Sequence, residues 1–267
     1  IIFDICNIQF LKCKEKNNYF KNIFNSNKNI TIIDGLGKAS IYKYIFKYSF
    51  TYYLPYYFKK NLKKSKKIKY YTGPKYFIFN KKFIKEKNKI VFNKNAKNIF
   101  ICFGGSDPTE LTYKIINILN EDFFRSFVFN IMLGPLISKN QKNKLYNFKN
   151  ISKLNINIYD NYKNFENLMR KTDIAILSNG HLKYEAFYLQ IPSIIVPMNK
   201  KFERFDKELS NLNLAFFLKY VDIKKNTKFN YLLYKLLNFT KLRYKMFKEC
   251  KSFFHSHDKN LALKLIK

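Results

Sequence analysis

Residues 99–119 read IFICFGGSDPTELTYKIINIL. Ile99–Phe103 is a continuous apolar run that ends at two glycines, and such a run is typical of a strand buried in a parallel sheet. Beyond the glycines, apolar side chains recur at the three- and four-residue spacing of a helix, at Leu111, Ile115, Ile116 and Leu119. The segment therefore predicts a buried strand, a tight turn and a helix.

The same alternation continues towards the C-terminus. Further strands are predicted at 127–133, 156–159, 174–177, 194–196 and 215–218, with helices around 165–169 and 181–189 and over most of the last 40 residues. Strands that alternate with helices at this spacing form parallel sheets covered by helices on both faces. We therefore expect an α/β protein with doubly wound parallel sheets.

The first 90 residues are less regular. A strand is predicted at Ile30–Ile33, and the tract Ile41–Phe58 is dense in Tyr and Phe with interspersed Lys. This tract could stack on nucleic-acid bases or lie on a membrane surface. We favour buried aromatic rings with lysines that extend to solvent. The polar segments Lys85–Lys89 and Asn93–Asn98 predict an interdomain linker.

The chain is strongly basic, with 51 Lys+Arg against 18 Asp+Glu and a formal charge of +33. Such a charge ordinarily points to nucleic acid or a membrane surface. However, only four basic residues are arginine, and Gly and Pro are scarce while Lys, Asn, Ile, Phe and Tyr are abundant. Because the scarce types have G/C-rich codons, we attribute the charge to an A/T-rich genome. We expect no nucleic-acid partner, and keep peripheral contact with a membrane as an alternative.

The four cysteines are scattered, without a CxxC pair, which fits a reducing cytoplasm. Cys102 lies in an apolar run and is expected to be a buried hydrophobic residue. His255 and His257 lack further ligands around them in sequence, so we predict no metal site and no cofactor. No apolar run of spanning length and no signal peptide are seen. The chain begins at Ile1, inside a predicted strand, which predicts a fragment of a longer protein.

The first candidate site is the turn Gly104-Gly105-Ser106-Asp107. Asp107 suits an N-cap, Pro108 the first helical position and Glu110 the third, so the helix is expected to start at Pro108. Backbone N–H groups at a helix N-terminus, approached past glycines without Cβ atoms, bind anions. At a switch point of a parallel sheet we favour a phosphate site over the alternative, a tight turn without a ligand.

The second candidate site lies in residues 173–197, DIAILSNGHLKYEAFYLQIPSIIVP. A predicted strand leads into Ser178-Asn179-Gly180 and then into a helix that presents His181 and Glu185. Glu185 could accept two hydrogen bonds from a ribose diol. The alternative, an exposed helix glutamate, is the commoner case for a single residue. His181 could contact phosphate or be a solvated residue near the helix start.

The chain resembles one known family in three segments, GPKYFIFNKKF (73–83), FGGSDPTELTYKIINIL (103–119) and LMRKTDIAILSNGHLKYEAFYLQIPSIIVP (168–197). This family contains the nucleotide-sugar hydrolase of pseudaminic acid biosynthesis and the spore-coat polysaccharide glycosyltransferase-like proteins. It belongs to the GT-B superfamily, near the family 28 glycosyltransferases. The resemblance implies a GT-B fold, in which residues 1–92 are the remaining part of a truncated N-terminal Rossmann-like domain. Residues 93–267 would be the C-terminal nucleotide-sugar-binding domain.

By this resemblance the C-terminal domain binds a UDP-sugar. The first glycine turn would face the diphosphate, and Gly180 and its neighbours would complete the diphosphate-binding site. Glu185 would hold the ribose. The implied binding residues are Gly104, Gly105, Ser106, Asp107, Ser178, Asn179, Gly180, His181 and Glu185. The implied reaction is hydrolysis of a UDP-linked diacetamido sugar, in surface-polysaccharide or nonulosonic acid biosynthesis. The alternatives are transfer of the sugar to an acceptor and a degenerate protein that binds nucleotide sugars without catalysis.

The chain also departs from the family's pattern. The family's N-terminal Gly-x-Gly-His-x-x-Arg loop, which supplies a catalytic histidine, has no counterpart, so no catalytic residue is assigned. Asn179 replaces the first of two glycines and Leu182 replaces a threonine. Lys201-Phe202 stands where an Asn-Gln pair is expected. These departures are expected to weaken nucleotide binding.

Overall fold

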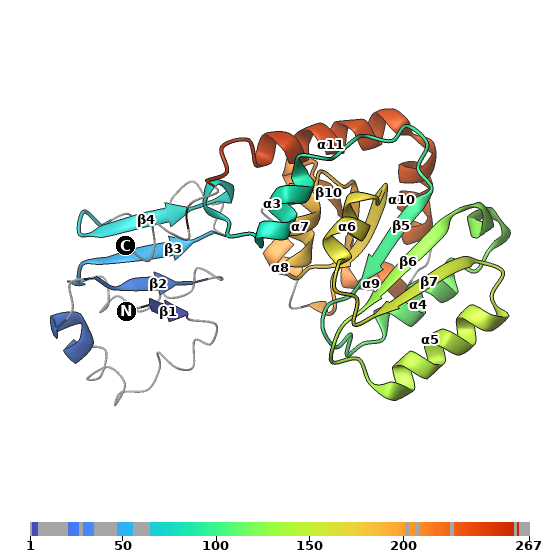
Figure 1. Ribbon diagram of the computed structural model, residues 1–267, viewed down its shortest axis with the longest axis horizontal. Helices are drawn as coiled ribbons and strands as arrows, with labels where there is room; N and C mark the ends of the chain where they lie inside the picture. The colour runs from blue at the N-terminus through green and yellow to red at the C-terminus, as the bar shows by residue number, and fades with distance from the viewer. Residues whose placement is uncertain are drawn as a thin grey trace. The chain divides into compact units, whose positions relative to one another are not determined.

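The computed structural model describes residues 2–4, 21–26, 29–34, 47–55, 65–200, 203–206, 209–224, 227–258 and 261 (Figure 1). The chain forms two compact units, and each is described by itself. The first comprises residues 1–78 and 253–267, and the second comprises residues 79–252. The predicted functional division after residue 92 stays a prediction.

The first unit contains a parallel sheet in the order β1-β2-β3-β4. Its strands are β1 (Ile2–Asp4), β2 (Thr31–Ile33), β3 (Phe50–Leu54) and β4 (Ile68–Thr72), followed by the short 3-10 helix η3 (Pro74–Tyr76). Apolar side chains from β2, β3 and β4 form its core, where Tyr52 donates a 2.6 Å hydrogen bond to Asp34. Phe50, Tyr52 and Tyr53 are buried, which confirms the favoured interpretation for the described part of the aromatic tract. Residues 41–46 and 56–58 of that tract, and Gly35–Gly37, lie outside the described residues.

The second unit is built on a six-stranded parallel sheet in the order β10-β9-β8-β5-β6-β7. The strands are β5 (Asn98–Cys102), β6 (Val128–Leu133), β7 (Asn155–Asp160), β8 (Ile174–Ser178), β9 (Ser193–Val196) and β10 (Ala215–Phe217). The helices are α3 (Lys81–Lys87), α4 (Leu111–Ile118), α5 (Lys139–Ile151), α6 (Phe165–Arg170), α7 (Leu182–Tyr188), α8 (Glu203–Asp206), α9 (Tyr220–Lys224), α10 (Thr227–Asn238) and α11 (Thr240–Phe253), with 3-10 turns η4 (Asp122–Ser126) and η6 (Ser210–Leu212).

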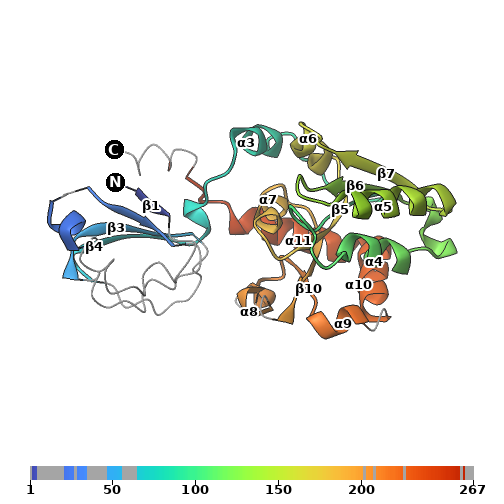
Figure 2. The same ribbon diagram turned by 90° about the horizontal axis from the view of Figure 1, so that it is seen from below.

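Both faces of this sheet are covered. Isoleucines of β5 and β8 pack with side chains of α4, α5, α10 and α11 in one large core, and α3 and α6 lie on the opposite side of the sheet (Figure 2). Every residue of β8 and β9 is buried, as expected for central strands between two helical layers. The doubly wound parallel α/β fold predicted from the sequence is therefore confirmed.

The linker predicted at Lys85–Lys89 and Asn93–Asn98 is wrong at residues 85–87, which are helical. Residues 81–87 form α3, because Phe83 is an apolar anchor, 1% exposed, on a helix whose other residues are mostly charged. Glu86 on this helix forms a 2.5 Å ion pair with Arg170 of α6. These contacts make α3 part of the second unit.

No helix in the described part of the chain is long and apolar enough to cross a bilayer.

Candidate functional site

The candidate site lies where the connections of the large sheet change direction. From β5 the chain proceeds through β6 and β7 on one side, and then returns to β8 on the other side of β5. Ligands of doubly wound sheets bind outside the carboxyl ends of the strands at such a switch point. Gly104-Gly105 follows β5 and Ser178-Asn179-Gly180 follows β8, so both predicted turns lie at this position.

The two turns meet at the Ser178 hydroxyl. A Cβ atom placed on Gly104 would lie 3.8 Å from Ser178 Oγ, and one on Gly180 would lie 3.7 Å from it. Gly104 has a φ of +85°, a conformation that side chains with a Cβ rarely adopt. Ser178 and Asn179 are buried, whereas Gly105, Ser106, Gly180 and His181 are exposed. Three small, exposed residues therefore form a rim over the buried Ser178 hydroxyl: Gly105, Ser106 and Gly180.

A third glycine, which was not among the residues predicted from the sequence, supports this rim. Gly134 follows β6, and a Cβ placed on it would lie 2.2 Å from the carbonyl oxygen of Gly104 and 2.3 Å from that of Gly105. The segment after β6 packs directly on the first glycine turn, and Leu136 N donates to Gly105 O at 2.8 Å. Only glycine fits at this position.

Asp107 caps helix α4, although not as the sequence predicted. The helix begins at Leu111 rather than Pro108, and both Asp107 and Glu110 have left-handed φ angles of 40° and 51°. This turn lets the two Asp107 carboxylate oxygens accept hydrogen bonds from the backbone N–H groups of Leu111 and Thr112, at 2.8 Å each. Because these two helix N–H groups are already paired with a carboxylate, an anion at this turn would depend on other backbone N–H groups of the turn.

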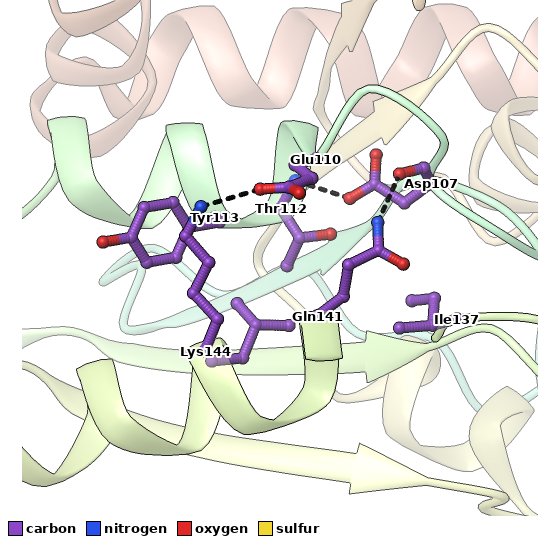
Figure 3. A pocket seen from close by; sticks show the side chains of 8 residues that line it. Asp107, Glu110, Thr112, Tyr113, Ile137, Gln141 and Lys144 are labelled. Atoms are coloured by element: carbon purple, nitrogen blue, oxygen red, sulfur yellow. Dashed lines mark hydrogen bonds and ion pairs between the residues drawn. The ribbon is translucent and has the colours of Figure 1, made fainter. Parts of the chain in front are cut away.

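The far side of the Asp107 turn is fixed by helix α5. Gln141 donates a 3.0 Å hydrogen bond to the Asp107 carbonyl oxygen, and Lys144 forms a 2.8 Å ion pair with Glu110 (Figure 3). The pocket between these side chains has a volume of about 10 Å³, enough for one water molecule. It is too small for a nucleotide and acts as part of the support for the turn.

Glu185 is half-buried in α7. Burial raises the pKa of its carboxyl to about 7, and the negative charge of Glu166 adds to this shift. Glu166 on α6 is 5% exposed, with its carboxylate 3.9 Å from the Lys82 ammonium. The alternative of an exposed helix glutamate is therefore wrong for Glu185. Its carboxyl is poised to change charge near neutral pH.

The remaining predicted residues have simpler surroundings. His181 is the exposed N-cap residue of α7, and its side chain makes no capping hydrogen bond to that helix. Cys102 is buried as predicted, and burial raises the pKa of its thiol to about 11. His257 lies in the first unit, with its Nε2 atom 2.7 Å from the Phe77 carbonyl oxygen. Among the described residues, no group of three or more His, Cys, Asp and Glu side chains is arranged to hold a metal ion.

Two proteins are similar to this chain in sequence, and no protein-family profile matches it. The uncharacterized protein MJ1062 of Methanocaldococcus jannaschii is 33% identical over 219 residues, covering 71% of this chain and 44% of that protein. The spore coat polysaccharide biosynthesis protein SpsG of Bacillus subtilis is 23% identical over 126 residues, covering 47% of this chain and 37% of that protein. The chain thus spans less than half the length of either relative.

Two solved structures show the same fold. MurG of Acinetobacter baumannii aligns with a TM-score of 0.60 at 13% identity, over 93% of this chain and 76% of that one. The spinosyn rhamnosyltransferase SpnG, complexed with thymidine diphosphate, aligns with a TM-score of 0.57 at 12% identity, over 94% of this chain and 76% of that one. The fold is therefore that of the GT-B glycosyltransferases.

Proposed function

We propose that this chain binds a sugar nucleotide, with the diphosphate at the two glycine turns and the ribose at Glu185. The observation that carries the proposal is the meeting of the Gly104 and Gly180 turns at Ser178 on the switch point of the sheet. Exposed backbone without Cβ atoms allows a phosphate to approach closely, and N–H groups there complement its charge. The net charge of +33 adds a long-range attraction for a diphosphate.

The nucleotide is proposed to be UDP, and the pathway to be surface-polysaccharide or nonulosonic acid biosynthesis. The thymidine diphosphate in the SpnG structure supports a nucleoside diphosphate on this fold, and the name of SpsG supports polysaccharide biosynthesis. Calorimetric titration with UDP tests the proposal. We expect saturable binding by the wild-type chain, weakened at least 10-fold in Glu185→Ala because the ribose loses its carboxylate partner. No heat of binding at millimolar UDP would contradict it.

The proposed reaction is hydrolysis, in which water attacks the anomeric carbon and UDP leaves with the electrons of the broken glycosyl–phosphate bond. No residue of this chain is assigned to activate the water. The glycosyltransferases that share the fold favour a second candidate, transfer of the sugar to an acceptor hydroxyl. UDP release from a UDP-linked diacetamido sugar without any acceptor would support hydrolysis. Release that requires an acceptor would support transfer, and UDP binding without release would support a non-catalytic binding protein.

We expect Glu185→Gln to raise the stability of the fold at pH 8, although it weakens UDP binding. Burial raises the pKa of Glu185 to about 7 from 4.5, so the folded protein favours the neutral carboxyl. The raised pKa means that the fold is most stable, relative to the unfolded chain, while the Glu185 carboxyl is neutral. This stabilisation is complete below pH 4.5 and is lost as the pH rises through 7. At pH 8 the glutamine variant should therefore be more stable than wild type by roughly 1–3 kcal/mol, with little difference below pH 4.5. Thermal unfolding at the two pH values measures this.

The same substitution should weaken UDP binding. The ribose hydroxyls donate to an ionised carboxylate, so UDP affinity should rise more steeply between pH 6 and pH 8 in wild type than in Glu185→Gln, where only the second ionisation of the UDP phosphate contributes. Glu121→Gln is the matched control, because Glu121 lies just beyond the C-terminal end of α4, away from the glycine turns, and is hydrogen-bonded to Asn230, so UDP affinity should stay at the wild-type value. A wild-type pH profile no steeper than that of Glu185→Gln, or an unchanged affinity in Glu185→Gln, would exclude the ribose role.

A further inference from the structure

The Ser178–Gly180 turn is bonded to a buried ion pair. Lys183 on α7 and Asp206 on α8 are 1% and 5% exposed, and their Nζ and Oδ1 atoms are 2.5 Å apart. Lys183 Nζ also donates to the carbonyl oxygen of Asn179 at 3.0 Å, and the Asn179 side chain hydrogen-bonds the Asp206 carboxylate. We call these three residues the Asn179–Lys183–Asp206 latch.

Both charges of the latch are held in an unfavourable environment. Burial lowers the pKa of Lys183 and raises the pKa of Asp206, and in each case the partner's charge opposes the shift. An apolar pair of similar volume would stabilise the fold as well as, or better than, an ion pair of this kind. What the ion pair adds is a fixed geometry, because the ammonium has to meet both the carboxylate and the Asn179 carbonyl.

The latch also explains a departure from the family pattern. Asn179 stands where the first of two glycines is expected, yet its φ is not in the left-handed region, so no glycine is needed there. Asn179 is 8% exposed, and its side chain reaches Asp206 rather than solvent. The substitution therefore exchanges a flexible glycine for an anchored, buried residue beneath the rim of the candidate site.

We propose that Lys183 and Asp206 are positioning residues for sugar-nucleotide binding. They hold the Ser178–Gly180 turn in the conformation that receives the diphosphate. Through the same contacts, UDP binding at the turn stabilises α8. This inference rests on the proposed function, since it requires that UDP binds at that turn. Neither residue touches the ligand. Both act through the backbone and side chain of Asn179.

The test compares UDP affinity, by calorimetry, with the thermal midpoint of unfolding in four variants. Lys183→Met and Asp206→Asn each leave one buried partner alone, and we expect both to lose at least 10-fold in UDP affinity with a lower midpoint. The double variant Lys183→Met/Asp206→Leu removes both charges, so the midpoint should recover while the affinity loss remains. Lys142→Met breaks the 2.7 Å Lys142–Asp160 ion pair elsewhere on the unit and should leave the affinity within twofold of wild type.

The double variant separates positioning from stability. If it regains both the wild-type midpoint and the wild-type affinity, the latch has no positioning role and the inference is overturned, although the proposed function stands. If the wild type itself does not bind UDP, the proposed function fails first. Hydrogen exchange on the wild type gives a second readout that does not depend on any variant folding. Amides of residues 203–206 should exchange more slowly with UDP bound, and unchanged exchange there in a UDP-saturated protein would also overturn the coupling.

Discussion

Gly134→Ala is expected to lower the free energy of unfolding of the second unit by about 3 kcal/mol or more. The added methyl carbon would lie 2.2–2.5 Å from three backbone atoms of Gly104 and Gly105. Backbone atoms at the end of a central strand cannot rotate away as the tip of a side chain can. Either the segment that follows β6 or the turn at Gly104 and Gly105 has to shift. For a unit of this size the thermal midpoint should fall by about 6–12 °C.

Gly180→Ala is the matched control for this prediction. A Cβ on Gly180 meets only Ser178 Oγ at 3.7 Å, an ordinary van der Waals contact, so the midpoint should change by about 2 °C or less. Equal midpoints for Gly134→Ala and wild type would show that the close packing of the segment that follows β6 on the turn at Gly104 and Gly105 is incorrect.

Gly105→Val is expected to abolish most UDP binding without loss of stability. A Cβ on Gly105 has no atom within 4 Å, and the residue is exposed, so the fold accommodates the valine. A diphosphate at the glycine turn would meet the isopropyl group instead of bare backbone. We expect an affinity loss of about 50-fold, or roughly 2.3 kcal/mol, by calorimetry with UDP.

The control for Gly105→Val is its own unfolding curve, because the proposal requires a folded protein that cannot bind. A thermal midpoint within about 2 °C of wild type together with the affinity loss would place the diphosphate at this turn. A folded Gly105→Val variant with wild-type affinity would show that UDP binds somewhere else.

The second unit was predictable because its strands, apart from β7, are nearly continuous apolar runs. Strands buried on both faces, such as Ile174–Ser178, give a signal that does not depend on side-chain alternation. The first unit was harder, because β3 and β4 mix tyrosine, threonine and lysine with apolar residues. Helix α3 was mistaken for a linker because a single buried phenylalanine, Phe83, anchors seven otherwise mostly charged residues.

The site was only partly predictable, because its residues act through tertiary contacts. The two glycine turns were found from their position after strands and from the scarcity of glycine. The late start of α4 was missed because a carboxylate four residues upstream, at Asp107, can satisfy the first helix N–H groups. The partner of Lys183 lies 23 residues away in sequence, so no local pattern shows the ion pair. The role of Gly134 depends on the approach of another strand's turn, which sequence spacing does not encode.

The most direct test uses the scarcity of glycine. The chain has seven glycines, so selective 15N-glycine labelling gives seven backbone amide signals. On titration with UDP, we expect the signals of Gly104, Gly105 and Gly180 to shift together with one dissociation constant. If none of these three signals shifts at millimolar UDP, the proposal that this switch point binds a nucleoside diphosphate is contradicted.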